Sequence, residues 1–347
     1  MKPKSRPGLF GAGLRSKIRS VETVLTYVIR RLLYSTLVLF AASVLVFWGM
    51  SLVTSPIGFL REQPNVSEQT IRNISERKHL DEPIYQRYGY WIQDMFTKKF
   101  GTETVSDLPI WPDLQRAMGH TVQLIVAAEL IAILIAVFIG VYSALRQYSV
   151  FDYAATTFSF VGLAMPVFWV ALMLQVLFVN IYLWFDVRIF YVASLNSVDP
   201  GSGVHFVLDR AQHLALPVIV LAVASIATYS RFMRASMLEV VNSDYVRTAR
   251  AKGLNDKRVT MKHAFRNALI PLITLIALNF GGLLGGAVVT ETVFALDGMG
   301  LYFITKLNAG DPYPVMAFLM VTAVFVVVFN LIADLAYGWL DPRVRLE

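Results

Sequence analysis

The sequence predicts an all-α membrane protein with six transmembrane helices. Hydrophobic residues make up 56% of the 347 residues and charged residues only 16%, whereas a soluble domain carries about 25% charged residues. Several segments run for roughly 20 residues with almost no charge, which is the length that a helix needs to cross a bilayer. Lysine and arginine are gathered in the segments before, between and after these runs, as in membrane proteins with basic cytoplasmic loops.

The apolar segments are expected to be helices because backbone polar groups in lipid must be hydrogen-bonded within the segment. Pro166, Pro217 and Pro271 are expected to kink or cap the helices in which they lie. The expected spans are residues 27–53, 120–145, 153–185, 211–240, 268–296 and 314–340.

The first span follows a basic segment, residues 1–26, and the transmembrane domain is expected to occupy residues 27–347. The apolar run after Arg31 is too long for a signal-peptide core and has no clear cleavage site, so it is interpreted as a span. The basic N-terminal segment, the basic loop after the fourth span, and Arg343 and Arg345 together predict that both termini and that loop are cytoplasmic.

Residues 55–118 form the longest polar excursion and are expected on the outer side of the membrane. Within them, one apolar and aromatic stripe follows helical spacing and consists of Ile84, Tyr88, Trp91, Ile92 and Met95. The stripe predicts a helix that rests on the membrane surface or caps the bundle. A direct role in gripping a delivered partner or ligand is the alternative.

The loop at 242–267 is basic but has the signals of ordered helices. Asn-Ser-Asp at 242–244 can cap a helix, Gly253 can end it, and Asn255 or Asp256 can cap a second one that continues into the fifth span. The loop is therefore predicted to be a helix, a glycine break and a helix.

The first of these helices is expected to expose a small, smooth face. Tyr245, Thr248 and Ala249 follow i, i+3, i+4 spacing, with arginine and lysine around them. Charge alone would favour a topology signal that also binds anionic headgroups. The capped helix with small residues instead favours docking into a groove of another protein.

Glycine pairs in the fifth span predict close helix packing, within the chain or against a partner, or a gate hinge. These are Gly281, Gly282, Gly285 and Gly286. Glu291 and Asp297 lie at the outer end of the same span, and the family resemblance described below implies that they form part of an outer gate. Five polar residues in or near the spans are candidates for substrate contact, for interhelical hydrogen bonds or, as a protonated carboxyl, for a place facing a cavity. They are Glu129, Gln175, Asn279, Asn330 and Asp334.

Several functional classes are disfavoured by the residues that the chain lacks. It contains no cysteine, its five histidines are scattered, and it has no HExxH, GxSxG or P-loop motif. We therefore expect no metal site, no catalytic residues, no bound cofactor and no ATPase site of its own. The net charge of +7 fits cytoplasmic loops, and no nucleic acid is expected as a partner.

The loop sequence DYVRTARAKG, followed by HAFRNALIP, resembles the cytoplasmic EAA loop of ABC-transporter importer permeases. The general pattern there is Glu-Ala-Ala, three residues, Gly, and a later Leu-Pro. Here Arg247, Thr248 and Ala249 stand in the first three positions, Gly253 holds the glycine, and the late pair is 270–271. The arginine and the late proline depart from the general motif and are similar to the peptide permease subfamily.

The resemblance covers most of the chain, in order. Segments similar to that subfamily are LDEPIYQRYGYWIQDMF, KKFGTETVSDLPIWPDLQRAMGHTVQLIVAAEL, AMPVFWVALML, GGLLGGAVVTETVFALDGMG, DPYPVMAFLM and LIADLAYGWLDPRVR. The chain is identified as resembling a B-type inner-membrane subunit of the oligopeptide and dipeptide (peptide/nickel) permeases. The resemblance implies the type I ABC importer permease fold, with a cytoplasmic coupling helix and an outer insertion between the first two helices.

The resemblance also implies a function and partners. A second homologous permease, two P-loop ATPase subunits that bind ATP and Mg²⁺, and an extracytoplasmic substrate-binding protein would import oligopeptides or dipeptides across the cell membrane. The expected docking core of the coupling helix is Thr248, Ala249, Ala251 and Gly253, and its expected rim is Tyr245, Arg247, Arg250 and Lys252.

Ala249→Glu is expected to uncouple ATP hydrolysis from transport without unfolding the bundle. The alternatives are the same machinery importing nickel or oligosaccharides, a stand-alone channel or facilitator, and an intramembrane enzyme.

Overall fold

The computed structural model describes residues 9–53, 57–58, 61 and 67–340. Expectations for residues 1–8, Arg343 and Arg345 lie outside this part of the chain. Its regular structure is helical throughout: α1 (Leu9–Val53), α3 (Glu68–Arg77), α4 (Ile84–Thr97), α5 (Ile110–Leu145), α6 (Val150–Ala164), α7 (Val167–Phe185), α8 (Val204–Val241), α9 (Asp244–Ala251), α10 (Asp256–Arg258), a π-helical segment (Val259–Phe265), α11 (Arg266–Val293), α12 (Met299–Asn308) and α13 (Pro312–Leu340).

Six helices in the described residues are long and apolar enough to cross a membrane, which confirms the predicted number. Their spans are Val28–Val53, Ile110–Leu145, Val167–Phe185, Val204–Val241, Asp256–Phe280 and Pro312–Leu335. α5 begins at Ile110, inside the predicted outer insertion, and the bounds of that insertion stay a prediction.

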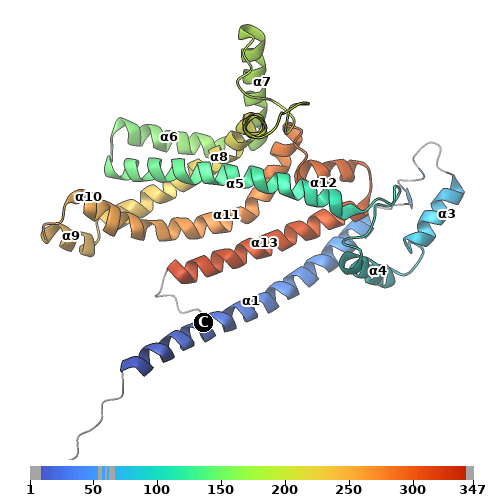
Figure 1. The fold of residues 1–347 in the computed structure, drawn as a ribbon, viewed down its shortest axis with the longest axis horizontal. Coiled ribbons are helices and arrows are strands. Elements are labelled where there is room, and N and C mark those ends of the chain that lie inside the picture. The colour runs from blue at the N-terminus through green and yellow to red at the C-terminus, as the bar shows by residue number, and fades with distance from the viewer. Residues whose placement is uncertain (1–8, 54–56, 59–60, 62–66, 341–347) are drawn as a thin grey trace, which may run out of the picture.

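The third span predicted over 153–185 is divided at one of the prolines that were expected to kink or cap a helix. The chain there forms two helices, and the break lies at Met165 and Pro166. Pro166 has no N–H to donate, and it forces the preceding residue out of the helical region. Met165 is accordingly extended, with φ −78° and ψ 126°. α7 then turns steeply away from α6 (Figure 1).

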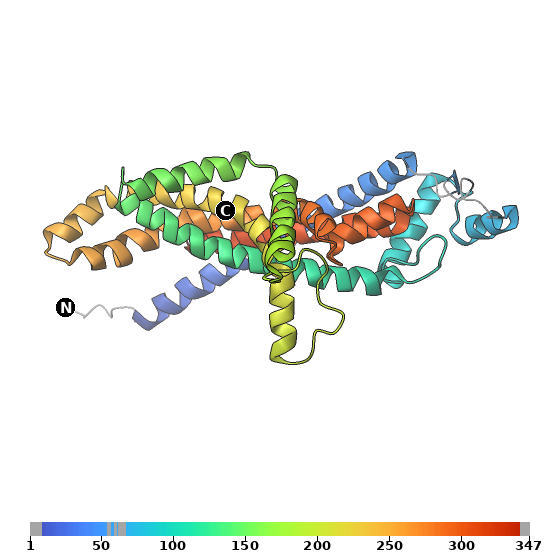
Figure 2. The same cartoon turned by 90° about the horizontal axis from the view of Figure 1, so that it is seen from above.

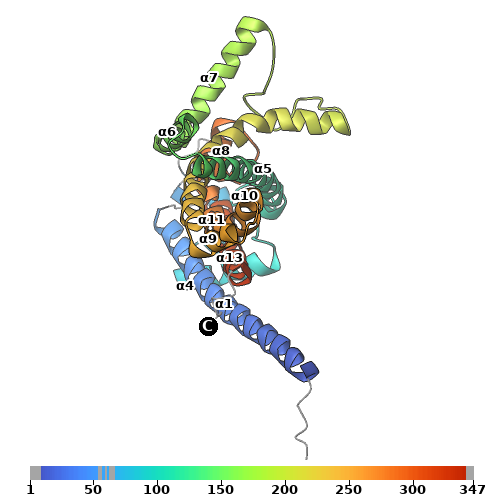
Figure 3. The ribbon, with the colours of Figure 1, turned by 90° about the vertical axis from the view of Figure 1, so that its left-hand side faces the viewer.

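The centre of the bundle is the packing of α5 along α8, with α11 and α13 beside them (Figures 1 and 2). At Gly140 on α5, an added Cβ would lie 2.6 Å from the Met233 Cβ and 2.7 Å from the Ser230 carbonyl oxygen of α8. The missing side chain therefore lets the two helices approach closely. α7 and the first part of α8 project from the bundle (Figure 3).

Helix α4 caps the bundle, as one of the interpretations of its stripe predicted. Trp91 is only 3% exposed and packs with Phe47 of α1 and with Met316 and Met320 of α13. The ends of α1 and α13 that are remote from α4 point toward the end of the bundle that carries α9 (Figure 1).

Polar contacts fix the loop after α4 to the corner between α12 and α13. The Asp311 carboxylate accepts hydrogen bonds from the Thr104 amide at 2.8 Å and from the Thr104 hydroxyl at 2.6 Å. Lys306 forms an ion pair with Glu103. Burial alone would raise the pKa of Glu103, but hydrogen bonds from Lys306 and Ser106 and the Lys306 charge hold it below its usual value.

Lys306→Met is expected to lower the thermal unfolding temperature at pH 7 and to have a smaller effect near pH 3. The lowered pKa of Glu103 means that its ionised form stabilises the fold above its unfolded-state pKa, about 4.3. This contribution is lost as the pH falls through the folded-state pKa. The measurement is thermal unfolding of the detergent-solubilised protein at both pH values.

Lys98→Met is the matched control, because the exposed Lys98–Asp94 pair lies on one helix face and such pairs contribute little. An equal effect of Lys306→Met at both pH values would contradict the assignment to Glu103.

Candidate functional site

The basic loop forms a short helical hairpin between α8 and α11, at the end of the bundle opposite α3 and α4 (Figure 1). Ser243 takes the N-cap position of α9 with extended backbone. Gly253 ends the turn after α9 with φ +79°, a conformation that residues with a Cβ rarely adopt. Asn255 caps α10 by accepting a hydrogen bond from the Lys257 amide. The predicted order of helix, glycine break and helix is thus confirmed.

α9 has one buried face, and this face holds Ala249. Val246 is 0% exposed and Ala249 is 8% exposed. Both belong to a core cluster with Val259 and Ala264 of the π-helical segment. The expectation that Ala249 contributes to an exposed docking face was therefore wrong. Its small side chain instead lets α9 pack closely on the second half of the hairpin.

The outward face of α9 and the turn after it contain the other predicted coupling residues. These exposed residues are Tyr245, Arg247, Thr248, Arg250, Ala251, Lys252 and Gly253. Side chains brace this face from the next segment: Asn267 donates a hydrogen bond to the Tyr245 hydroxyl at 2.9 Å, and Arg250 pairs with Asp256 at 3.2 Å. The face is therefore ordered, and it joins small residues to basic ones.

The hairpin is joined to the transmembrane helices by a continuous core. The cluster that contains Val246 and Ala249 also contains Met237 of α8 and Leu272 of α11. Each of these four residues is at most 8% exposed. Because close-packed interiors transmit displacement, a force on α9 would be passed to both α8 and α11.

The structure describes the surroundings of one of the four glycines singled out in the fifth span. Gly282 is exposed, and a Cβ added to it would meet no atom within 4 Å. Gly282 therefore does not pack against another helix of the described chain, which corrects that part of the prediction. The surroundings of Gly281, Gly285 and Gly286 lie outside the described side chains. A contact with a partner or a hinge stays a prediction.

Glu291 and Asp297 differ in their surroundings. Glu291 is 1% exposed. Its carboxylate accepts hydrogen bonds from the Thr121 hydroxyl and from the Gly300 amide, each at 2.6 Å. Asp297 is exposed, and its backbone carbonyl accepts a hydrogen bond from His120 at 2.7 Å. Glu291 therefore fixes the turn after α11 onto α5, while Asp297 faces outward; a gating role of either stays a prediction.

Glu129 connects α5 to α8 within the membrane. It is 1% exposed, and its two carboxylate oxygens accept hydrogen bonds from the Ser225 hydroxyl at 2.8 Å and from the Tyr229 hydroxyl at 3.0 Å. This geometry is that of an interhelical hydrogen bond, which is one of the roles considered for Glu129. A contact with substrate stays a prediction.

Glu129→Ala is expected to lower the free energy of unfolding by about 1–3 kcal/mol, because two buried hydroxyl groups lose their acceptor. Glu129→Gln should lose less, since its amide keeps one acceptor oxygen. The checks are thermal unfolding in detergent and the apparent KM for transport. A raised KM with unchanged stability would instead assign Glu129 to substrate contact.

The other intramembrane polar residues also join elements. Gln175 of α7 donates hydrogen bonds to the carbonyls of Val192 and Val293, at 2.8 and 2.9 Å. Asp334 of α13 pairs with Arg31 of α1 at 2.7 Å. Asn279 and Asn330 are half-buried. In the described residues, no three His, Asp or Glu side chains gather as metal ligands would.

The ion pair between Asp152 and Arg234 was not predicted from the sequence. Asp152 of α6 is almost fully buried, with a side chain 4% exposed, and accepts bonds from Arg234 of α8 at 2.7 and 2.8 Å. Ser143 of α5 also donates to it. The available signal was the Ser149-x-x-Asp152 spacing of a helix N-terminus and an arginine inside an apolar span.

Comparison with known proteins shows which family has a matching sequence. Residues 136–346 match the family described as binding-protein-dependent transport system inner membrane component. An oligopeptide transport system permease protein of Bacillus subtilis is 38% identical over 321 residues, covering 92% of this chain and 99% of the relative. A dipeptide transport system permease protein of Alkalihalophilus pseudofirmus is 36% identical over 333 residues, covering 93% and 100%. A di/tripeptide transport system permease protein of Pseudomonas aeruginosa is 34% identical over 335 residues, covering 93% and 99%.

The family model covers α6 to α13, which include the hairpin around α9, and the relatives extend the match to 92–93% of the chain. The six apolar helices and the ordered hairpin agree with this placement. The chain therefore belongs to the family of binding-protein-dependent transport system inner membrane components.

Proposed function

We propose that this chain is the membrane-spanning permease subunit of an ATP-driven importer of oligopeptides or dipeptides. Its relatives are named as oligopeptide, dipeptide and di/tripeptide transport permeases. The observation that carries the proposal is α9, whose braced outward face is joined by a buried core to α8 and α11. Such a helix suits docking to a partner that moves.

The proposed assembly contains a second homologous permease, two P-loop ATPase subunits and an extracytoplasmic substrate-binding protein. ATP and Mg²⁺ are bound by the ATPase subunits, and this chain has no enzymatic activity of its own. Both termini and α9 face the cytoplasm, in agreement with the basic residues of the loop at 242–267. The peptide passes between the two permeases.

The proposed mechanism is mechanical. α9 sits in a cleft of the ATPase subunit, with Thr248, Ala251 and Gly253 at the contact. Closure of the ATPase subunits moves α9, and the buried cluster of Val246 and Ala249 carries this movement to α8 and α11. The bundle then changes between inward-facing and outward-facing states.

Uptake of a labelled peptide into proteoliposomes tests the proposal. The complex is purified from native cells through a tag on this chain, and its components are identified by mass spectrometry. Uptake that requires ATP and the binding protein supports the proposal. Uptake of the peptide without ATP, by the chain alone, would indicate a channel. ATP-driven uptake of nickel or an oligosaccharide but not peptide would overturn the substrate.

Single cysteines test the contact of α9, because the natural chain contains none. Ala251→Cys should crosslink to a cysteine in the ATPase cleft, since Ala251 is exposed on α9. Ala249→Cys is the matched control on the same helix, and its buried position should prevent crosslinking. Equal crosslinking at both positions, or none at Ala251, would contradict the proposed seating of α9.

A further inference from the structure

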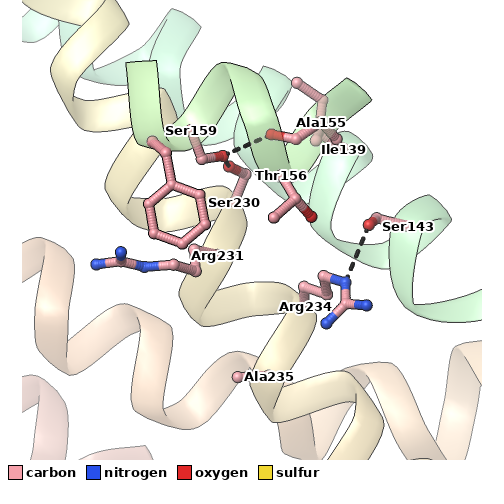
Figure 4. Close-up of a pocket in the computed structure, with 10 residues that line it drawn as sticks. Ile139, Ser143, Ala155, Thr156, Ser159, Ser230, Arg231, Arg234 and Ala235 are labelled. Atoms are coloured by element: carbon pink, nitrogen blue, oxygen red, sulfur yellow. Dashed lines mark hydrogen bonds between the residues drawn. The ribbon is translucent and has the colours of Figure 1, made fainter. Parts of the chain in front are cut away.

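A cavity of about 250 Å³ lies between α5, α6 and α8, on the side of the bundle where α9 is attached (Figure 4). Most of its lining surface consists of apolar atoms, and Ile139 of α5 and Phe160 of α6 contribute to it. Two arginines of α8, Arg231 and Arg234, also line it, and no carboxylate is among its lining residues. A ligand for this cavity should therefore combine an apolar part with negative charge.

The two arginines are not equivalent. The charge of Arg234 is balanced by its bidentate contact with Asp152. Arg231 is exposed, and its guanidinium lies 5.8 Å from the centre of the Phe160 ring. Within the described part of the chain, no acidic side chain forms an ion pair with Arg231. The cavity therefore carries one uncompensated positive charge at its edge.

Hydroxyl groups supply further hydrogen-bond donors. In Figure 4 the side chain of Thr156 of α6 lies nearer to Arg234, and the guanidinium of Arg231 points away from both. No bond of the Thr156 hydroxyl to another described residue is found. Ser159 and Ser230 lie beside it, 3.1 Å apart. An oxyanion at the edge of the cavity could accept charge-assisted hydrogen bonds from Arg231.

The depth of the cavity suits a lipid phosphate. Ser143 lies two residues before the end of α5, and Thr156 lies six residues after the start of α6. At 1.5 Å per residue, these positions are about 3–9 Å from the helix ends. The polar headgroup layer of a bilayer is about 5–8 Å thick on each side. The cavity therefore lies where the phosphate layer meets the acyl chains.

We propose that this cavity is a binding site for an anionic phospholipid of the leaflet at the α9 end of the bundle. The lipid phosphate binds Arg231 at the edge of the cavity, and the start of an acyl chain lies along Ile139 and Phe160. A net negative headgroup, such as phosphatidylglycerol, is favoured over zwitterionic phosphatidylcholine, because only the former balances the additional charge of Arg231.

The test is native mass spectrometry of the purified complex with phosphatidylglycerol or phosphatidylcholine of identical acyl chains. The natural protein is expected to retain phosphatidylglycerol preferentially. Arg231→Gln should weaken that binding about tenfold, as expected for loss of a charge-assisted contact. Arg231→Lys should keep part of it.

Arg188→Gln is the matched control, because Arg188 is also exposed and lies over aromatic rings, 4.6 Å from Tyr182, but belongs to the loop after α7. It should leave the binding unchanged. An equal loss in Arg188→Gln, or no preference between the two lipids in the natural protein, would overturn the proposal.

A second measurement uses the natural sequence and does not depend on the folding of a variant. A photoactivatable phosphatidylglycerol is crosslinked in nanodiscs, and the labelled peptides are mapped. Label on α6 around Phe160 supports the site. Label that is absent there but present on other lipid-facing helices would overturn it.

Discussion

Ala251→Glu is expected to reduce ATP-dependent transport at least about tenfold while the chain still folds and inserts. Ala251 is exposed at the end of α9, so the glutamate remains in solvent in the isolated chain. In the proposed complex, its bulk and negative charge would enter the contact with the ATPase subunit. Loss of one central interface contact commonly costs more than the 1.4 kcal/mol that corresponds to tenfold. Peptide uptake and ATPase activity in proteoliposomes measure the effect.

The comparison with Ala249→Glu separates coupling from folding. At Ala249 the glutamate would be buried against Val259 and Ala264, without a partner for its charge. This substitution is therefore expected to reduce the yield of folded protein and its unfolding temperature, which replaces the expectation that it would uncouple a folded bundle. Normal transport by Ala251→Glu would remove α9 as the contact with the ATPase.

Arg234→Met is expected to lower the free energy of unfolding by about 3–5 kcal/mol, because it leaves the buried Asp152 carboxylate without its partner. Loss of this ion pair would also loosen α6 from α8. The thermal unfolding temperature and the fraction of monodisperse protein in detergent are the measurements.

The double substitution Asp152→Asn with Arg234→Met should recover part of the loss, since it removes both charges. Lys252→Met is the control for loss of one positive charge, because Lys252 is exposed and forms no ion pair within the described residues. If Arg234→Met had the same small effect as Lys252→Met, the Asp152 contact would not hold α6 in place.

Most of the helices could be predicted from the sequence because their signals are local. A run of apolar residues long enough to cross a bilayer must be helical, whatever surrounds it. The ordered loop was also predictable, since Gly253 and Asn255 have conformational preferences that depend on a few neighbouring atoms. The break at Pro166 was noted as a kink or cap, but its size depends on what α7 packs against.

The assignment of faces could not be derived in the same way. Ala249 and Ala251 are the same residue type on one short helix, and their spacing does not say which of them faces the core. Contacts with Val259 and Ala264 decide this, and they require the chain to turn back on itself. The same holds for Glu129, whose partners on α8 lie 96 and 100 residues further along the chain.

The sequence by itself thus determined that this chain crosses the membrane in helices, where most of them lie, and that the basic loop is ordered. Only the tertiary structure decided which face of α9 is outward, that Asp152 pairs with Arg234, and that a charged cavity lies beside them. The physical reason is the distance along the chain over which each interaction acts. Solvent preference and backbone conformation act within a few residues, whereas burial and ion pairing depend on helices brought together from distant parts of the chain.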